Sequence, residues 1–287
     1  MAMLDVKNTK LYISYGIVGC GNMSQAFFGR LFKDNKNKQR RVIMTYTPSN
    51  TRAHELADSI GGTSVKNLKY LNHTEVICLC FKPQQLKRFL TDAREIDFSG
   101  KTIVSILAGV DLKTLKEYFP NSPIIRLMPS MPVENGQGIS LISHTDDVSK
   151  KVLDELELLS SKHSMVIKLE EKLFDKLTLV TSSGPAFVYY LFASFAKSLE
   201  EAGIRKDNSK EIIHKLFLGA LSMIKNDKRD VEDLIADVCS FKGVTAAGIE
   251  ELGRQNVSES ILGAIDKGVE RSRELQSEVR SDLPNLQ

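Results

Sequence analysis

Two glycines near the amino terminus have the spacing of a phosphate-binding loop. Residues 16–27, GIVGCGNMSQAF, place Gly19 and Gly21 between an apolar, β-branched run and a helical pattern that begins near Asn22. In dinucleotide-binding folds the first such glycine permits a tight turn, and the second lets a pyrophosphate approach the N–H groups that begin the helix. The third position of the GxGxxG pattern is Ser24, and a purely structural turn is the alternative. The strand–loop–helix context favours a cofactor loop.

The end of the second predicted strand bears on which dinucleotide is bound. Residues 44–52, MTYTPSNTR, contain no Asp or Glu, the residues that hydrogen-bond the ribose 2′-hydroxyl of NAD. Ser49, Asn50 and Arg52 instead offer hydrogen-bond donors, which suit a 2′-phosphate. The sequence therefore favours NADP over NAD, which stays possible. The alternative is that Ser49 or Asn50 only caps the helix that follows.

Three further segments follow predicted strands: CFKPQQ (80–85), LAGV (107–110) and RLMPSMP (126–132). In open α/β sheets ligands bind beyond the carboxyl ends of the strands, so these loops are expected at one ligand-binding edge. The two prolines of the third segment have an alternative explanation, since proline also ends strands.

Residues 238–252, VCSFKGVTAAGIEEL, place Ser240, Gly243 and Thr245 between two helical patterns. Hydroxyl groups beside a glycine bend are suited to hold a small polar ligand, but a plain turn between helices would use the same residue types. Residues 182–187, SSGPAF, pose a similar choice, because serine caps helices and proline begins them.

The elements that must position these residues divide the chain in two. In residues 1–166 apolar runs typical of buried strands alternate with helical patterns, which predicts a parallel, Rossmann-type α/β domain that binds NAD(P). Residues 167–287 are helical in pattern almost throughout, with breaks expected at Gly184-Pro185, Gly203, Asn226-Asp227 and the 238–252 stretch. Residues 187–204 are apolar over most of a helical circumference, so they are expected in a core or against a second subunit. We therefore predict a helical dimerisation domain and a homodimer.

Composition limits the classes of partner. The 287 residues, 42% hydrophobic and 26% charged, are typical of a globular chain of two domains. The 39 Lys and Arg nearly balance the 36 Asp and Glu, which argues against a nucleic-acid partner. The four cysteines and five histidines form no metal-ligand pattern, so no metal is expected. The first ten residues lack an apolar leader, and no apolar run of membrane-spanning length is expected, so we predict a cytoplasmic protein that binds no membrane.

Several of these segments occur together, in the same order, in one family. They are GxGNM (Gly19, Gly21, Asn22, Met23), KPQ (Lys82, Pro83, Gln84), AGV (Ala108, Gly109, Val110) and SGPA (Ser183, Gly184, Pro185, Ala186), the last preceded by Asp175. With this set the chain resembles the pyrroline-5-carboxylate reductases over nearly its whole length.

The resemblance implies NADPH-dependent hydride transfer to the C=N bond of 1-pyrroline-5-carboxylate, giving L-proline. It implies that the first three motifs bind the cofactor. It further implies that Ser183, Gly184, Ser240, Gly243 and Thr245 bind the imino acid, with Ser240 and Thr245 as the catalytic residues. In the family, the loop that carries them meets the cofactor site across a dimer.

The chain departs from the family pattern in two loops. Where the family has Ser-Pro-Gly-Gly-Thr-Thr, residues 240–245 read SFKGVT, and where the family has MPNTP, Ser130 and Met131 replace Asn and Thr. These changes leave two alternatives open: a reductase of a related imine, and a catalytically silent regulatory paralogue that retains NADP binding. Hydroxyacid dehydrogenases rank third, because no motif matches their catalytic lysine.

Overall fold

The computed structural model describes residues 12–33, 35 and 41–282. The amino-terminal ten residues, on which the expectation about a leader rested, lie outside this range. The described chain forms two compact units. The first contains the described residues up to Ser182 and those from Val269 onward, and the second is Ser183–Gly268. The domain boundary predicted after residue 166 was drawn by type of architecture, and it stays a prediction.

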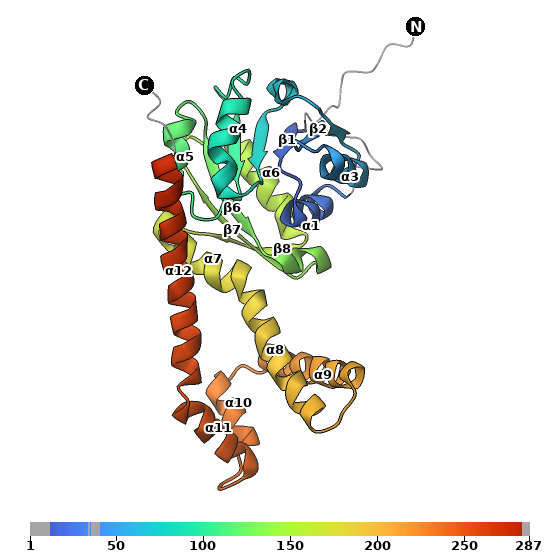
Figure 1. The fold of residues 1–287 in the computed structure, drawn as a ribbon, viewed down its shortest axis with the longest axis vertical. Helices are drawn as coiled ribbons and strands as arrows, with labels where there is room; N and C mark the ends of the chain where they lie inside the picture. Colours follow the sequence, from blue (N-terminus) through green and yellow to red (C-terminus); the bar gives the residue numbers. More distant parts are fainter. Residues whose placement is uncertain (1–11, 34, 36–40, 283–287) are drawn as a thin grey trace. The chain divides into compact units, whose positions relative to one another are not determined.

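The first unit is built on an eight-stranded sheet in the order β3-β2-β1-β4-β5-β6-β7-β8 (Figure 1). The strands are β1 (Tyr15–Val18), β2 (Ile43–Tyr46), β3 (Thr63–Ser64), β4 (Val76–Leu79), β5 (Thr102–Ser105), β6 (Ile124–Pro129), β7 (Gly138–His144) and β8 (Ser164–Lys168). Because β1 pairs with β2 on one side and β4 on the other, the chain reverses direction across the sheet at the β1–β4 boundary. A crevice outside the carboxyl ends of the strands is expected at such a point.

Helices cover both faces of this sheet, which is why the central strands are apolar without interruption. Alternate residues of a strand enter different clusters: Cys78 packs with α1 (Asn22–Leu31), α3 (Thr51–Ile60) and α6 (Lys150–Ser161). Ile77 and Leu79 pack with α4 (Leu86–Asp92) and α5 (Leu112–Tyr118). The carboxyl-terminal end of α12 (Val257–Asp282) contributes Val279 to the second cluster. The two periodicities read from the sequence thus correspond to a sheet buried on both sides.

The sheet differs from the all-parallel expectation at one pairing, so that β7 and β8 run opposite to the other strands. β7 runs antiparallel to β6, while the other paired strands are parallel. Only residues 130–137, which include the 3₁₀ turn Met131–Asn135, connect β6 to β7, and a parallel crossover needs a dozen residues or more. The strands β3 and β8 were not expected from the sequence. β3 has two residues, and β8 offers only a short apolar run, Met165 to Ile167, whose side chains are exposed or half-buried.

The second unit is helical, as predicted. It holds α8 (Gly184–Glu201), α9 (Lys206–Asn226), α10 (Val231–Val238), α11 (Val244–Arg254) and the first half of α12. Breaks occur near Gly203, after Asn226 and between Val238 and Val244, as expected. The break expected at Gly184-Pro185 is wrong: α7 (Glu171–Thr178) continues through a π-helical turn, Leu179–Ser183, directly into α8. Pro185, the second residue of α8, has no N–H to donate to the preceding turn, and that turn is the wider, π-helical one.

One helical stretch, Glu171–Glu201, is long and apolar enough to cross a membrane by length and composition alone, so the expectation that no such run exists is wrong on this criterion. None of its most apolar window is buried within the single chain. The apolar side chains of α8 therefore need a covering surface that one chain does not provide.

Candidate functional site

A cleft of about 820 Å³ lies at the carboxyl edge of the sheet. Its lining includes residues 19–24 after β1, Tyr46 at the end of β2 with 47–49 and Arg52 after it, 80–83 after β4, Ile106 and Ala108 after β5, and Met128 in β6. Successive strands thus each contribute to one cavity at the point where the strand order reverses, which is where this class of fold binds its ligand.

The two glycines of the loop are required for different reasons. Gly19 has φ +91°, and a Cβ there would lie 2.7 Å from the backbone carbonyl of Cys80, so the β1 and β4 loops could not approach with any side chain present. Gly21 has ordinary backbone angles and precedes α1 as its N-cap. A Cβ on Gly21 would meet no protein atom within 4 Å. The protein itself therefore leaves space beside Gly21, in the wall of the cleft.

Ser24 closes the same loop at the third position of the pattern. Its side chain is buried, and its Oγ donates a hydrogen bond to the Gly19 carbonyl oxygen at 2.5 Å. A small side chain that satisfies the loop carbonyl replaces the glycine that usually gives close packing there. The substitution is thus compatible with the dinucleotide fold.

The start of α1 fits a phosphate group. No side chain caps this helix, so its first N–H groups point toward the cleft edge without a side-chain partner among the described residues. Asn22 and Met23, both predicted cofactor residues, form this first turn and line the cleft. Thr47 also lines it, and its hydroxyl is buried without a hydrogen-bond partner in the part of the chain that the structure describes. The donors of the cleft therefore match an anionic, hydroxyl-rich ligand such as a dinucleotide.

At the β2 end of the cleft, the predicted cofactor residues Ser49 and Arg52 line the cleft, whereas Asn50 does not. Arg52 Nη1 donates to Asn22 Oδ1 at 3.2 Å, which holds the guanidinium beside the start of α1. Asn50 has a left-handed backbone, φ 58°, and its Oδ1 accepts from Ser64 Oγ at 2.5 Å. Asn50 is thus the N-cap residue of α3, but its side chain makes no capping hydrogen bond and instead fastens the β2–α3 turn to β3.

The β4 and β5 loops differ in how they meet the cleft. Lys82, Pro83 and Ala108 line it, whereas Gly109 is absent from the lining. Gly109 has φ +70°, and a Cβ there would lie 2.8 Å from the Ser272 carbonyl oxygen of α12. Gly109 therefore permits close packing of the loop on α12, and its predicted cofactor contact stays a prediction.

Thiol chemistry in the cleft is disfavoured. Burial raises the pKa of the Cys20 thiol to about 12, although a hydrogen bond to Tyr46 lowers it slightly. Burial likewise raises the pKa of Cys78 and Cys80. These thiols are protonated at neutral pH and are therefore poor nucleophiles.

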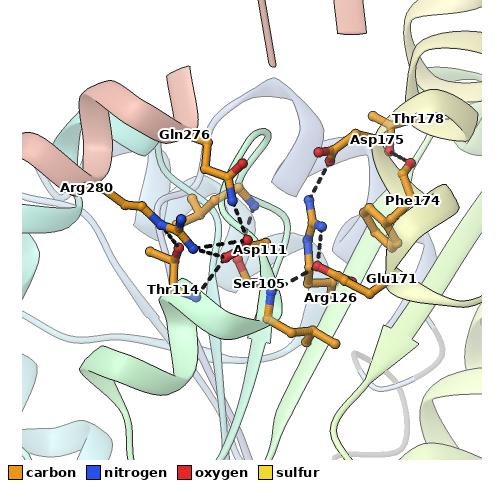
Figure 2. Close-up of polar contacts among 12 residues, drawn as sticks. Ser105, Asp111, Thr114, Arg126, Glu171, Phe174, Asp175, Thr178, Gln276 and Arg280 are labelled. Atoms are coloured by element: carbon orange, nitrogen blue, oxygen red, sulfur yellow. Dashed lines mark hydrogen bonds and ion pairs between the residues drawn. The ribbon is translucent and has the colours of Figure 1, made fainter. Parts of the chain in front are cut away.

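A buried ionic cluster lies beside the β5 loop, and sequence analysis missed it (Figure 2). Arg126 in β6, with 2% of its side chain exposed, donates to Glu171 Oε1 at 2.6 Å and to Asp175 Oδ1 at 2.9 Å, both on α7. Its guanidinium stacks 4.1 Å above the Phe174 ring. The available signal was the single charged residue within the apolar run PIIRLMP, since a buried arginine requires partners.

None of the predicted substrate residues is among the residues that line the cleft. Ser240 and Thr245 are exposed, and Gly243 is the N-cap of α11. A Cβ on Gly243 would overlap Ser240 Oγ, so the glycine leaves room for the serine hydroxyl in its present orientation. Gly184 begins α8, directly after the π-helical turn that ends at Ser183. These five residues belong to the second unit and the cleft to the first, so their assignment stays a prediction.

The altered loops adopt ordinary structure. Ser130 is buried, and its Oγ accepts from the Ile139 N–H at 2.8 Å, which secures the β6–β7 pair. Lys242 has a left-handed backbone, φ 52°, at the place where the family pattern has glycine. Phe241 and Val244 are 91% and 93% exposed. Residues 240–243 thus form a turn, closed by a hydrogen bond from the Gly243 N–H to the Ser240 carbonyl oxygen, with large side chains on its surface.

Comparison with known proteins assigns the two parts of the chain. Residues 171–275 match the family model for the pyrroline-5-carboxylate reductase dimerisation domain, and residues 14–109 match that for NADP oxidoreductase, coenzyme F420-dependent. The chain therefore carries a dimerisation domain, and its amino-terminal domain is of an NADP-binding type.

Whole-length relatives agree. The pyrroline-5-carboxylate reductase of Glycine max is 30% identical over 261 residues, covering 91% of this chain and 95% of the relative. That of Staphylococcus haemolyticus is 27% identical over 259 residues, covering 90% and 96%.

Solved structures show the same fold. The 1-pyrroline-5-carboxylate reductase of Streptococcus pyogenes superimposes with a TM-score of 0.81 at 25% identity, covering 91% of this chain and 98% of that one. The Plasmodium falciparum pyrroline carboxylate reductase, which has NADP bound, gives 0.80 at 21% identity, covering 92% and 100%. On the strength of the motifs, the cleft and these whole-length matches, the chain belongs to the pyrroline-5-carboxylate reductase family.

Proposed function

We propose that this protein reduces the C=N bond of 1-pyrroline-5-carboxylate with NADPH and so forms L-proline. The observation that carries the proposal is the cleft at the β1–β4 boundary, formed by the motifs that the family shares. The nearly full-length match to reductases of this name supports it.

The residues of the cleft divide the work of holding the cofactor. The N–H groups at the start of α1, beside Gly21, would donate to the pyrophosphate, and Arg52 with Ser49 would donate to the 2′-phosphate. Ile106, Ala108 and Met128 line the cleft on the β5 and β6 side with mainly apolar surface, which suits the nicotinamide end. When bound, NADPH supplies the hydride.

Little acid–base chemistry is required of the side chains. A protonated imine is already electrophilic at carbon, so positioning it against the nicotinamide supplies much of the rate acceleration. The hydride forms a new C–H bond, and the electrons of the C=N π bond pass to the nitrogen, which becomes the amine of proline. Thr245 hydrogen-bonds near that nitrogen, and Ser240 with the N–H groups at the start of α11 holds the carboxylate.

We also propose that the active form is a homodimer in the cytoplasm, assembled through the helical unit. Its support is the dimerisation-domain match at residues 171–275 and the apolar side chains exposed on α8 and α9. Tyr190 on α8 is 75% exposed and Leu221 on α9 is 59% exposed, which is unfavourable for a lone chain.

The test is oxidation of NADPH in the presence of 1-pyrroline-5-carboxylate, with L-proline identified as product. Thr245→Ala is expected to lower kcat/KM for the imine about tenfold, because a lost hydrogen bond costs roughly 1 to 3 kcal/mol and about 1.4 kcal/mol is one factor of ten. Ser161→Ala, which removes an exposed hydroxyl at the end of α6, is the control and should behave as wild type.

Two results would favour the alternatives over the proposal. NADPH binding without turnover of any imine would indicate a silent paralogue. Turnover of another cyclic or acyclic imine in preference to this one would indicate a related reductase. The related-imine alternative stays open because the replaced residues Phe241 and Val244 are almost fully exposed at the altered loop.

A further inference from the structure

The loop between β5 and α5 belongs to the cofactor cleft at one end only. Ile106 and Ala108 line the cleft, whereas Asp111, at the other end, is the N-cap of α5 and accepts from the Thr114 N–H at 2.7 Å. Between these ends the backbone passes through Gly109 in a left-handed conformation. The position of Ala108 in the cleft wall therefore depends on what holds the rest of this loop.

Two helices hold the loop from outside the sheet. On the α7 side, Glu171 Oε1 accepts from the Leu112 N–H at 2.9 Å. On the α12 side, the Asp111 carboxylate accepts from the Gln276 side-chain amide, and Arg280 Nη2 lies 3.3 Å from Asp111 Oδ2. Figure 2 shows Asp111 facing α12 and Glu171 facing Arg126. The loop is thus fastened by a carboxylate at each side.

Glu171 does more than pair with Arg126. One oxygen atom, Oε1, accepts from both Arg126 Nη1 and the Leu112 N–H, while Oε2 is buried without a hydrogen-bond partner among the described residues. The buried guanidinium of Arg126 fixes the orientation of this carboxylate, because an arginine removed from water holds its counter-ions closely. Asp175 pairs with the same guanidinium, but no hydrogen bond among the described residues joins its side chain to the loop.

From this arrangement we infer that Glu171 is a positioning residue for the cofactor. It holds the backbone of residues 108–112 so that Ala108 forms the β5 wall of the cleft before the dinucleotide arrives. Arg126 acts on the loop only indirectly, because it orients the Glu171 carboxylate. The inference rests on the proposed function in one respect, namely that the cleft binds NADPH.

A preorganised wall has a measurable effect on affinity. If the loop occupies its binding conformation only part of the time, the apparent Kd rises in inverse proportion to that occupancy. If loss of the Glu171 hydrogen bond leaves the loop in its binding conformation about one tenth of the time, the NADPH Kd rises about tenfold. A merely structural ion pair would instead lower the melting temperature and leave the NADPH Kd unchanged.

Asp175 provides a matched control. Glu171→Ala and Asp175→Ala each remove one carboxylate from Arg126 and both lie on α7, but only Glu171 contacts the loop. NADPH binding to the full-length protein, followed by nucleotide fluorescence well below the melting temperature, is expected to weaken about tenfold in Glu171→Ala and to stay near wild type in Asp175→Ala. Glu171→Gln keeps an oxygen acceptor for Leu112, so it should recover much of the affinity.

Hydrogen exchange gives a second readout that does not depend on affinity. The Leu112 amide should exchange faster in Glu171→Ala than in Asp175→Ala, since only the first loses its acceptor. If the alanine variants do not fold, Glu171→Gln and Asp175→Asn are compared in the same way, with a smaller but same-signed difference expected.

The outcomes separate the two claims. Equal NADPH Kd values in the Glu171 and Asp175 variants, with wild type binding normally, would overturn the positioning role and leave the proposed function intact. A wild-type protein that does not bind NADPH would overturn both.

Discussion

At the scale of single residues, a glycine in this cleft is required either by the protein or by its ligand. At Gly19 the protein requires it, because the backbone of Cys80 occupies the place of a side chain. At Gly21 no protein atom lies near that place. The two positions look alike in the sequence, and only their surroundings distinguish folding from binding.

This difference predicts opposite phenotypes for two alanine substitutions. Gly19→Ala should lower the free energy of unfolding by roughly 2 to 4 kcal/mol, because it adds both a strained left-handed backbone and a steric overlap. Gly21→Ala should lower stability by only roughly 0.5 to 1 kcal/mol, because alanine is a poorer N-cap than glycine, yet raise the NADPH Kd at least tenfold, since a methyl group fills the phosphate position. Urea unfolding and NADPH titration of each variant measure the two effects.

Gly29→Ala, inside the carboxyl-terminal half of α1 and with free space around it, is the control. It should raise stability by about 0.5 to 1 kcal/mol and leave NADPH binding unchanged. A Gly21→Ala protein that binds NADPH as wild type does would remove the α1 amino terminus from the cofactor site.

Arg52 is the residue that we expect to separate NADPH from NADH. Its guanidinium lies in the cleft beside Asn22 and faces no acidic lining residue at the β2 end among those described. Arg52→Ala should raise the Kd for NADPH about tenfold, because a charge-assisted hydrogen bond contributes roughly 1.5 to 3 kcal/mol. The Kd for NADH, which lacks the 2′-phosphate, should change little.

The ratio of the two dissociation constants is the measurement, with Arg88→Ala as the comparison. Arg88 also lines the cleft but pairs with Asp92 at 3.5 Å, so its loss should not change the NADPH-to-NADH ratio. An unchanged ratio in Arg52→Ala would place the 2′-phosphate elsewhere.

At the scale of elements, the β5 loop depends on caps and charges supplied by two helices. Asp111 begins α5 and faces Arg280 of α12, so one carboxylate serves as a helix cap and as part of an ion pair. Burial raises its pKa, but hydrogen bonds from Thr114 and the charges of Arg280 and Arg126 outweigh burial, and the net pKa lies below the ordinary value of 3.8.

The sign of that shift predicts a pH dependence. A carboxylate whose pKa is lower in the folded chain stabilises the fold at neutral pH, and this contribution is lost as the pH falls below 3.8 toward the folded-state pKa. Asp111→Asn keeps the cap but lacks the charge. It should therefore be less stable than wild type at neutral pH, and the difference should narrow as acid protonates Asp111 in the wild type.

Chemical denaturation of both proteins across this acid range gives the comparison. A stability difference that stays constant, or widens, as the pH falls through this range would mean that the charge of Asp111 does not contribute and that the cap alone matters.

At the scale of the whole molecule, the chain exposes apolar surface on one of its units much more than on the other. The strands and helices of the first unit enclose their own core, whereas α8 and α9 keep many large apolar side chains exposed. The family match assigns this helical region to dimerisation, which explains why a single chain leaves it uncovered.

Leu221→Glu on α9 should therefore prevent or weaken dimer formation, because it places a charge in an apolar interface. Light scattering on the eluting protein should show a shift toward monomer, with turnover reduced and NADPH binding retained, since residues of the first unit line the cleft. Leu158→Glu on α6 is the matched control, with 65% of Leu158 exposed against 59% of Leu221. Should Leu221→Glu remain a dimer, α9 would lie outside the interface.

Local patterns in the sequence were sufficient for much of the fold and part of the site. The strand–glycine–helix pattern around Gly19 and the missing acid after β2 identified a dinucleotide loop and favoured NADP, because both depend on neighbours within a few residues. The alternation of strands and helices predicted a Rossmann-type sheet, and the later helical patterning predicted the helical unit. Motif order identified the family that the comparisons confirmed.

Contacts between distant residues were decided only by the tertiary structure. Arg126 finds its counter-ions 45 and 49 residues later, and Asp111 meets Gln276 165 residues later. The antiparallel β7 follows from a connection too short for a crossover, and the return of α12 places Ser272 against Gly109. Such contacts cannot be read from a local pattern, because the energy of burying a charge or a glycine turn depends on which elements the whole fold brings to it.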